Sequence, residues 1–353
     1  MWQTQIVQGT NLSNKPILSV LAKRTYSITH KEAPREASQQ IPITLNDTYD
    51  DEANPASAEV TAESELVAFK PSTDLVVLGK AKCPSGKLAY FLDCEVKAGP
   101  YKKTIRVFGN RKLQAKALRG LSLSDPEPFS EMPLGYRYAY GGNAVSKNGT
   151  AYSFYPNPIG RGFTLKGSLE DASEVPVPNI EDPSSPLNGE HFLLSKFSEW
   201  TDIPAPVSLG WTRKNFYPRY TFCGVLPEHL EGAMNRESEN SDSSSEKGKV
   251  PVMDHLFYQG ASEGLYGKRL AGNELVQLTN LDSAHPTFQT VLPAESPTIV
   301  IDIGNGKKEL EPVLDTVVIH KEQNLITLLW RGSLGLESRD EISELKKLEW
   351  QAR

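Results

Sequence analysis

Alternating apolar and polar positions dominate this chain. Between residues 88 and 97, an apolar side chain occupies every second position, and polar residues such as Asp93 fill most positions in between. This period of two predicts a strand with one buried face. Residues 75–81 are expected to pair with it through the turn CPSGK, and residues 103–109 to add a third strand after the turn AGPYK. The N-terminal region, 1–121, is therefore predicted to be a β-meander.

The same pattern returns near the C-terminus. Apolar runs at 298–303, 313–320 and 324–330 are separated by the turn-rich GNGKKELEP and the polar HKEQN. They predict a second antiparallel meander in the region 293–353. In the tail EISELKKLEWQ, isoleucine and leucine recur at helical spacing, which favours a short terminal helix, although LKKLEW also fits a strand.

The middle region, 122–292, contains most of the 25 prolines and few helical periods, so we expect short strands and structured loops. Two stretches are expected to be mobile. One is 46–65, which is acidic and alanine-rich; the other, 235–249, is too polar to offset its ordering entropy and is predicted to be a disordered insertion. The whole chain is predicted to be mainly β, with antiparallel sheets in a sandwich or barrel-like arrangement, few helices, and one or two compact domains.

Charge and composition narrow the possible partners. The chain has 38 Lys and Arg residues against 44 Asp and Glu, so no excess positive potential favours nucleic acid or an anionic membrane surface. No apolar run reaches the ~20 residues that span a bilayer, and the N-terminus lacks the pattern of an export signal. The three cysteines fit no C-x-x-C spacing. We therefore expect a cytoplasmic protein with reduced thiols.

Two patterns could carry catalysis. Residues 260–264, GASEG, match the G-x-S-x-G nucleophile elbow around Ser262, but an elbow needs a following helix and a parallel sheet, and the loop sequence LYGKRLAGN follows here. Neighbouring carboxylates such as Glu181 and Asp182 could serve glycoside hydrolysis only at the right separation in space. The six histidines are scattered, and no phosphate-binding glycine motif occurs. No metal, cofactor or nucleotide site is predicted.

Residues 131–163 are rich in tyrosine, glycine and asparagine–proline steps. Tyrosine is enriched at the energetic centres of interfaces, so these rings could line a groove for a partner. Alternatively, Tyr136, Tyr138 and Tyr140 alternate along a strand and pack on the core, while the glycines only permit turns. The sequence leaves both interpretations open. The aromatic side chains concerned are Tyr136, Tyr138, Tyr140, Tyr152, Phe154 and Tyr155.

Several motifs, in order along nearly the whole chain, resemble the domain-of-unknown-function 2169 family. The match begins with FKPSTDLVVLGKAKCPSGK at 69–87 and continues with KTIRVFGNR at 103–111. The middle carries the most specific pieces. These are MPL at 132–134, YGG at 140–142 where the family more often has FGG, NPIGRG at 157–162, PNIEDP at 178–183, Trp211, and GNELVQLTNL at 272–281.

Members of that family are regarded as adaptors that load effectors onto the spike of the bacterial type VI secretion system. The resemblance therefore implies a non-enzymatic adaptor or chaperone without a cofactor. Such a protein holds the N-terminal region of a toxin effector and delivers it to the spike-tip protein. Interfaces of this kind depend on a few aromatic or arginine anchors. The residues expected to bind the partner are Tyr140, Asn157, Arg161, Phe163 and Trp211.

Other classes of function stay open. A serine hydrolase would use Ser262, and a glycosidase would use a pair of acids. A carbohydrate-binding β module would stack sugars on exposed tyrosines such as Tyr152 and Tyr155. Residues 226–267 depart from the family pattern, so the sequence identifies neither the effector nor the surface that contacts it.

Overall fold

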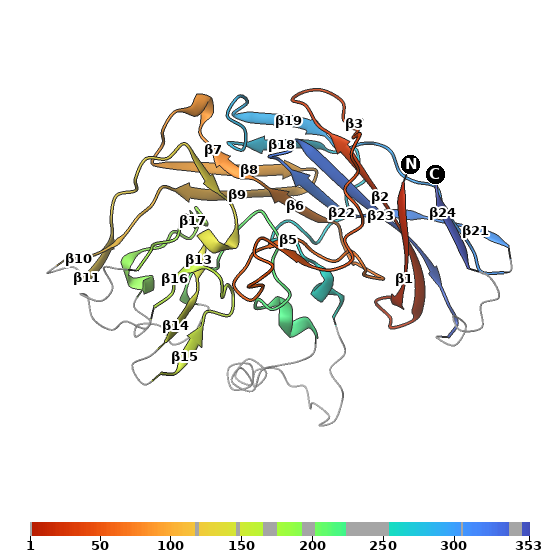
Figure 1. Ribbon diagram of the computed structural model, residues 1–353, viewed down its shortest axis with the longest axis horizontal. Coiled ribbons are helices and arrows are strands. Elements are labelled where there is room, and N and C mark those ends of the chain that lie inside the picture. Colours follow the sequence, from red (N-terminus) through yellow and green to blue (C-terminus); the bar gives the residue numbers. More distant parts are fainter. Residues whose placement is uncertain are drawn as a thin grey trace.

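The computed structural model describes residues 2–116, 120–145, 149–164, 175–192, 202–223, 254–304, 306–338 and 348–353 (Figure 1). Strands are the main regular elements of these residues, and the helical elements are 3₁₀ turns of at most five residues. The prediction of a mainly β fold with antiparallel sheets and few helices is confirmed. Residues 235–249, the predicted disordered insertion, lie outside the described residues.

The larger sheet has six strands in the order β1-β2-β23-β22-β6, with β3 attached to β2. Its neighbours are antiparallel except β22 and β6, which run parallel with Thr316 opposite Asp74. The central strands are buried on both faces, and β2 even buries Lys23. The bounds are β1 Gln3–Thr10, β2 Pro16–Ser27, β3 Arg35–Glu36, β6 Asp74–Leu78, β22 Pro312–His320 and β23 Leu325–Gly335.

The second sheet has five antiparallel strands in the order β17-β9-β8-β18-β19. Alternate side chains along its strands point to opposite faces of the sheet. Cys94 and Val96 lie on the buried face, whereas Asp93 lies on the other face and pairs with Arg106 at 2.7 Å. The bounds are β8 Phe91–Ala98, β9 Tyr101–Phe108, β17 Ile180–Glu181, β18 Leu275–Thr279 and β19 Thr287–Val291. One hydrophobic core joins this sheet to the six-stranded one.

Short strand pairs extend this framework. A three-stranded sheet has the order β21-β20-β24, and most of the remaining pairs are small hairpins. The pair β13–β16 is parallel and belongs to a second, aromatic core. The bounds are β4 Thr48–Tyr49, β5 Val60–Ala62, β7 Lys80–Lys82, β10 Leu113–Lys116, β11 Gly120–Leu123, β12 Glu131–Pro133, β13 Tyr140–Gly141, β14 Asn143–Val145, β15 Ala151–Ser153, β16 Arg161–Gly162, β20 Ile299–Asp302, β21 Lys307–Leu310 and β24 Glu349–Ala352.

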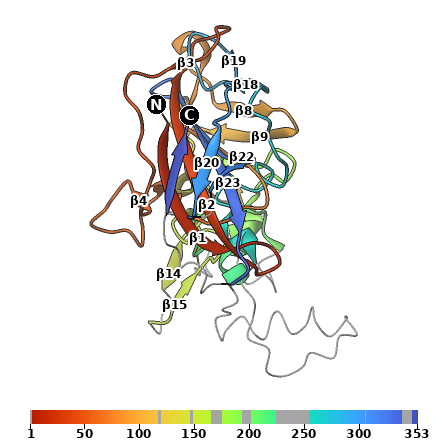
Figure 2. The ribbon, with the colours of Figure 1, turned by 90° about the vertical axis from the view of Figure 1, so that its right-hand side faces the viewer.

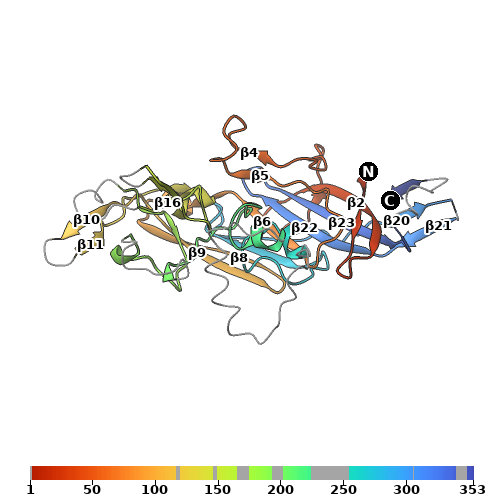
Figure 3. The ribbon, with the colours of Figure 1, turned by 90° about the horizontal axis from the view of Figure 1, so that it is seen from below.

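The molecule is elongated and flat, with both termini at the end that carries β20, β21 and β24 (Figures 1 and 2). The hairpin β10–β11 lies at the opposite end (Figure 1). Seen from below, the hairpin β4–β5 stands out from one broad side, and β8 and β9 lie on the other (Figure 3). The described 3₁₀ turns are η1 Pro84–Gly86, η2 Tyr136–Tyr138, η3 Gly189–Phe192, η6 Arg219–Cys223 and η7 His255–Tyr258.

The expected N-terminal meander is only half correct. The hairpin β8–β9 forms as predicted, but residues 75–81 do not pair with β8. They divide into β6, which joins β22, and β7, which joins β12. The turn at η1 therefore leads out of one sheet and into another. The parallel partner β22 buries Leu75, Val76 and Val77 completely, which a two-stranded hairpin could not do.

The C-terminal predictions are corrected in the same way. The hairpin β22–β23 is present, but β20 belongs to a separate sheet, and its partner β21 lies within the stretch predicted to be a turn. The expected terminal helix is wrong in its described part, because Glu349–Ala352 is strand β24, with Trp350 opposite Ile301. Pairing with β20 outweighs a weak helical periodicity there. Residues 339–347 lie outside the described residues.

Candidate functional site

The first family motif is held together by a buried ion pair. Lys70 Nζ donates to Asp74 Oδ2 at 2.7 Å and to Thr316 Oγ1 at 3.1 Å, and both charged side chains are almost completely buried. Thr73 Oγ1 donates to the carbonyl oxygen of Leu314 at 2.7 Å. These contacts hold the start of β6 against β22, so the motif fixes the unusual parallel pairing of these two strands.

Asp74 also anchors the loop that follows η7. Its carboxylate accepts hydrogen bonds from Gln259 Nε2 at 2.6 Å and from the backbone N–H of Gly260 at 2.9 Å. Burial alone would lower the pKa of Lys70, but the carboxylates of Asp74 and Asp315 outweigh it and raise that pKa. Lys70 therefore stays charged, and its role is to brace the fold.

Ser262 lies in this anchored loop and is completely buried. Its Oγ is 2.8 Å from the hydroxyl oxygen of Tyr136, whose pKa is raised by burial. The residues after Ser262 form a turn and a loop, so the strand-to-helix geometry of a nucleophile elbow is absent from this described segment. The contacts indicate a structural serine that ties the loop to η2.

Asn157 organises the YGG and NPIGRG motifs. Its buried side chain donates from Nδ2 to the carbonyl oxygens of Tyr136 at 2.7 Å and Tyr140 at 2.9 Å. The backbone N–H of Gly142 donates to the Asn157 carbonyl oxygen at 2.9 Å. Gly141 has a φ of 149°, and a Cβ on it would overlap that carbonyl. Close packing of two backbone segments around one amide explains why these motifs need glycine.

Four of the five predicted partner-binding residues come together here, and three of them face inward. Tyr140 packs edge-on against Phe154 and donates its hydroxyl to the carbonyl of His191, and Phe163 is buried beside Phe154. Asn157 is also fully buried. Arg161, opposite Tyr140 in the β13–β16 pair, is only partly buried.

Arg161 braces the segment around η2. Its Nε donates to the carbonyl of Arg137 at 3.0 Å, one terminal nitrogen donates to Asn179 Oδ1 at 2.9 Å, and its guanidinium lies 4.4 Å from the centre of the Tyr138 ring. Burial lowers the pKa of Arg161. Asn179 belongs to the PNIEDP motif, so Arg161 connects two family motifs.

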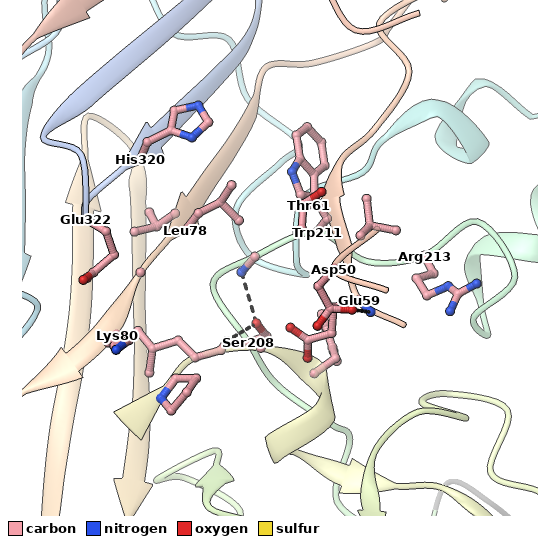
Figure 4. Close-up of a pocket in the computed structure, with 18 of the residues that line it drawn as sticks. Asp50, Glu59, Thr61, Leu78, Lys80, Ser208, Trp211, Arg213, His320 and Glu322 are labelled. Carbon is pink, nitrogen blue, oxygen red and sulfur yellow. Dashed lines mark hydrogen bonds between the residues drawn. The ribbon is translucent and has the colours of Figure 1, made fainter. Parts of the chain in front are cut away.

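Trp211, the fifth predicted residue, does not belong to this cluster. It lines a cavity of about 410 Å³. The cavity lies between β5, the end of β6, η2 and residues 208–213. Figure 4 shows Leu78, Lys80 and Glu322 on one side of it and Asp50, Glu59 and Thr61 on the other. Exposed residues, including Glu322 and Gln323, line the cavity as well, so it opens to solvent. Its volume is within the range of ~300–1,000 Å³ typical of ligand pockets.

Several polar residues that line this cavity have a buried donor or a shifted pKa. The Nε1 of Trp211 is buried and has no hydrogen-bond partner among the described residues. Burial raises the pKa of Glu59, although the backbone N–H of Arg137 donates to its carboxylate. Burial also lowers the pKa of His320 to about 4, so its imidazole is neutral at neutral pH. The cavity is therefore lined by a carboxyl and an imidazole whose pKa values burial shifts, whereas the Trp211 donor is closed off from solvent.

The hairpin that carries Glu59 was expected to be mobile, and the structure corrects this. Glu63 is buried and ion-paired with Arg219, and Lys214 reaches Asp47 at 2.8 Å. Arg137 pairs with Asp50 at 2.9 Å. These charges, which in the sequence look like solvated acids, fasten the hairpin over the cavity.

A larger cavity of about 670 Å³ lies near η6 and η7. Its wall includes Tyr217, Phe222 and residues 202–206. Both ends of that wall continue into residues outside the described ranges, 193–201 and 224–253. No residue that lines the Trp211 cavity is next in sequence to such a range, and this cavity is the candidate site.

A model of a protein family, described as "Uncharacterized protein conserved in bacteria (DUF2169)", matches residues 13–331. The chain belongs to the DUF2169 family. Comparisons with curated proteins and with solved structures gave no match. In this DUF2169 protein, contacts of the motif residues Lys70, Asp74, Asn157 and Arg161 hold together the segments around the Trp211 cavity. We call these contacts the frame of the cavity.

Two further observations concern the described part of this DUF2169 protein. It contains no group of three or more His, Cys, Asp or Glu side chains placed to hold a metal ion. It also contains no helix that is long and apolar enough to cross a membrane. The lining residues Glu59 and His320 carry no motif signal in the sequence, because only the fold brings them, partly buried, to the same cavity as Trp211.

Because His320 is neutral in the folded protein, we expect the free energy of unfolding to fall at acidic pH. Its pKa of about 4 in the folded state lies below the ~6.5 of an unfolded histidine, so the unfolded chain binds more protons between these values. Stability is therefore lost as pH falls below about 6.5, by about 1–2 kcal/mol at about pH 5. Urea unfolding of wild type and His320→Gln at about pH 7 and at about pH 5 measures this loss of stability. A variant with the same loss as wild type would contradict the assignment.

Proposed function

We propose that this protein is a non-enzymatic, cytoplasmic adaptor or chaperone that binds the N-terminal region of a type VI secretion effector and helps load it onto the spike protein. The family motifs support this proposal through the adaptor role that the resemblance implies. The observation that carries it is the Trp211 cavity, which opens to solvent and has partly apolar walls such as Val60, Leu134 and Phe216.

The rigidity of the frame favours reversible binding. Buried ion pairs at Lys70–Asp74 and Arg219–Glu63 hold the cavity walls before any partner arrives. A preformed site loses little conformational entropy on binding, so a small contact area can be sufficient. An adaptor that releases its effector at the spike needs such a moderate interface.

A serine hydrolase is the main alternative, and the surroundings of Ser262 do not favour it. Its hydroxyl contacts a phenol whose pKa is raised by burial, whereas a nucleophilic serine needs a nearby general base. Hydrolysis of model esters by the pure protein, lost in Ser262→Ala and retained in Tyr152→Ala, would replace the adaptor proposal with an enzyme.

Co-purification tests the proposal directly. The tagged protein is co-expressed with the toxin and spike-tip proteins encoded beside its gene, and we expect it to retain the toxin but not a toxin that lacks its N-terminal region. Trp211→Ala is expected to weaken retention about tenfold or more, as for an interface anchor. Arg161→Ala, a brace of the frame, is expected to weaken it less. A folded protein that retains no neighbouring toxin would contradict the proposal.

A further inference from the structure

We propose that the outer edge of β1 pairs with the same edge of a second copy of this chain, in antiparallel register about a two-fold axis. The surface consists of the outward backbone groups of Thr4, Ile6 and Gln8. The juxtaposition that carries this inference is an edge strand of eight uncharged residues whose outward groups bond to no other described backbone. This pairing does not depend on the adaptor function.

The backbone groups of β1 alternate between β2 and the outside of the sheet. The N–H of Asn11 donates to the carbonyl oxygen of Lys15 at 2.9 Å, and the register of β1 with β2 continues from this pair without a shift. In an antiparallel pair, every second residue forms such bonds. The odd-numbered residues of β1 therefore bond to β2, and the even-numbered residues direct their N–H and carbonyl groups out of the sheet.

These outward groups have few contacts with the described residues. His255 Nε2 donates to the carbonyl oxygen of Thr10 at 3.1 Å and closes one end of the edge. The carbonyl oxygen of Ile6 accepts from the side-chain amide of its neighbour Gln5 at 3.3 Å, a contact that rotation of the glutamine side chain would release. The edge from Thr4 to Gln8 is therefore available to another strand.

The other edges of the two large sheets are covered or charged. At β19, Gln289 donates its N–H to His30 Nδ1 at 3.0 Å and accepts from the N–H of Lys31 at 2.8 Å. At β6, the N–H groups of Leu75 and Val77 donate to carbonyl oxygens of loops. The short strand β3 consists of two charged residues, and β17 forms a further bridge on its outer side. Because proteins block their edges in such ways to prevent association, the unprotected edge of β1 indicates strand pairing.

The composition of β1 fits a second copy of itself. Its sequence, QTQIVQGT, has no charge and no proline, and its register with β2 has no bulge. Two copies therefore meet without the repulsion that disfavours like charges on opposite strands. The register that uses the open residues places Ile6 opposite Ile6 of the second copy, and Thr4 opposite Gln8 of the second copy. It would form about six new backbone hydrogen bonds.

A second layer adds surface at this edge. The strands of the three-stranded sheet lie against the large sheet in matching order, with β21 near β23, β20 near β2 and β24 near β1 (Figure 2). Trp350 of β24 packs against the same hydrophobic core as Ile6. A two-fold axis perpendicular to the β1 pair crosses both layers, so it would also bring β24 toward β24 of the second copy. The same patch of both chains then forms the interface.

Sedimentation velocity of the full-length protein tests this pairing. At about 50 µM we expect dimers of twice the 39.0 kDa chain mass. Gln8→Pro removes an outward N–H, and proline is tolerated at an edge where the N–H faces outward. This variant should weaken dimerisation about tenfold or more, because each dimer loses two hydrogen bonds.

Two charge variants test the register and keep every backbone N–H. Thr4→Lys with Gln8→Lys places like charges opposite each other across the pair and should abolish dimers. Thr4→Lys with Gln8→Glu places opposite charges there and should retain them. The two variants change the same positions, so the pairing across the axis is what separates them.

Thermal melting of each variant establishes that it is folded. Wild-type protein that stays monomeric at about 50 µM would overturn the inference. Dimers that persist in Gln8→Pro and in both charge variants would also overturn it, because they would form through another surface. Loss of dimers in both charge variants would contradict the proposed register, which requires the opposite charges to attract.

Discussion

Replacing Asp74 with alanine is expected to lower the free energy of unfolding by about 3–5 kcal/mol, the usual result of breaking a buried ion pair. The variant leaves the Lys70 ammonium buried without its counter-charge, and it removes the acceptor for Gln259 Nε2 and for the backbone N–H of Gly260. Because a domain of ordinary stability has about 5–15 kcal/mol in total, the variant should be close to unfolding. Urea denaturation at neutral pH measures the change.

Glu131→Ala is the matched control. Glu131 forms an equally short ion pair with Lys80, but both side chains are more than a third exposed. Exposed pairs of this kind contribute about 0–1 kcal/mol. If Asp74→Ala and Glu131→Ala were equally stable, Asp74 would not be the brace that positions β6 and the loop after η7.

Gly141→Ala is expected to destabilise the protein by about 3 kcal/mol or more, because it combines backbone strain with overpacking. Its φ of 149° is unfavourable for a side chain, and the added Cβ would overlap the carbonyl of Asn157, which is backbone and cannot swing aside. The motif should open around Asn157. Tyr136, which Asn157 holds and which lines the Trp211 cavity, should then lose its position.

Gly335→Ala serves as the control for this glycine. Gly335 is exposed at the end of β23, and a Cβ there would meet no atom within 4 Å. The change should alter the free energy of unfolding by no more than about 0.5 kcal/mol. Thermal and urea unfolding of both variants should separate them clearly. A Gly141→Ala protein as stable as Gly335→Ala would show that the YGG motif does not require its glycines for packing.

Local alternation was sufficient to predict individual strands but not all of their partners. Strands β8 and β9 follow each other through a short turn, so sequence proximity identifies the pair. The pairing of β6 with β22 joins residues about 240 positions apart, Asp74 with Thr316, and no local pattern encodes it. It depends on the buried Lys70–Asp74 pair, which in the sequence looks like two ordinary surface charges.

The site was predictable only through the resemblance, and then only in part. Trp211 was chosen as a family position, and it lines the cavity. Tyr140 belongs to the YGG motif and Phe163 directly follows NPIGRG, and both are buried in the aromatic core. A motif marks residues that a family needs, but it does not separate those that hold a loop from those that meet a partner. Burial makes that distinction, and burial is a property of the folded chain.

Hydrogen exchange with and without the co-purified toxin shows directly whether this protein holds its partner at the Trp211 cavity. We expect slower exchange in residues 59–61, 134–136 and 208–211, which supply walls of the cavity, and no change in β20, β21 and β24 at the end with both termini. Protection confined to surfaces away from the cavity, with exchange around Trp211 unaltered, would contradict it.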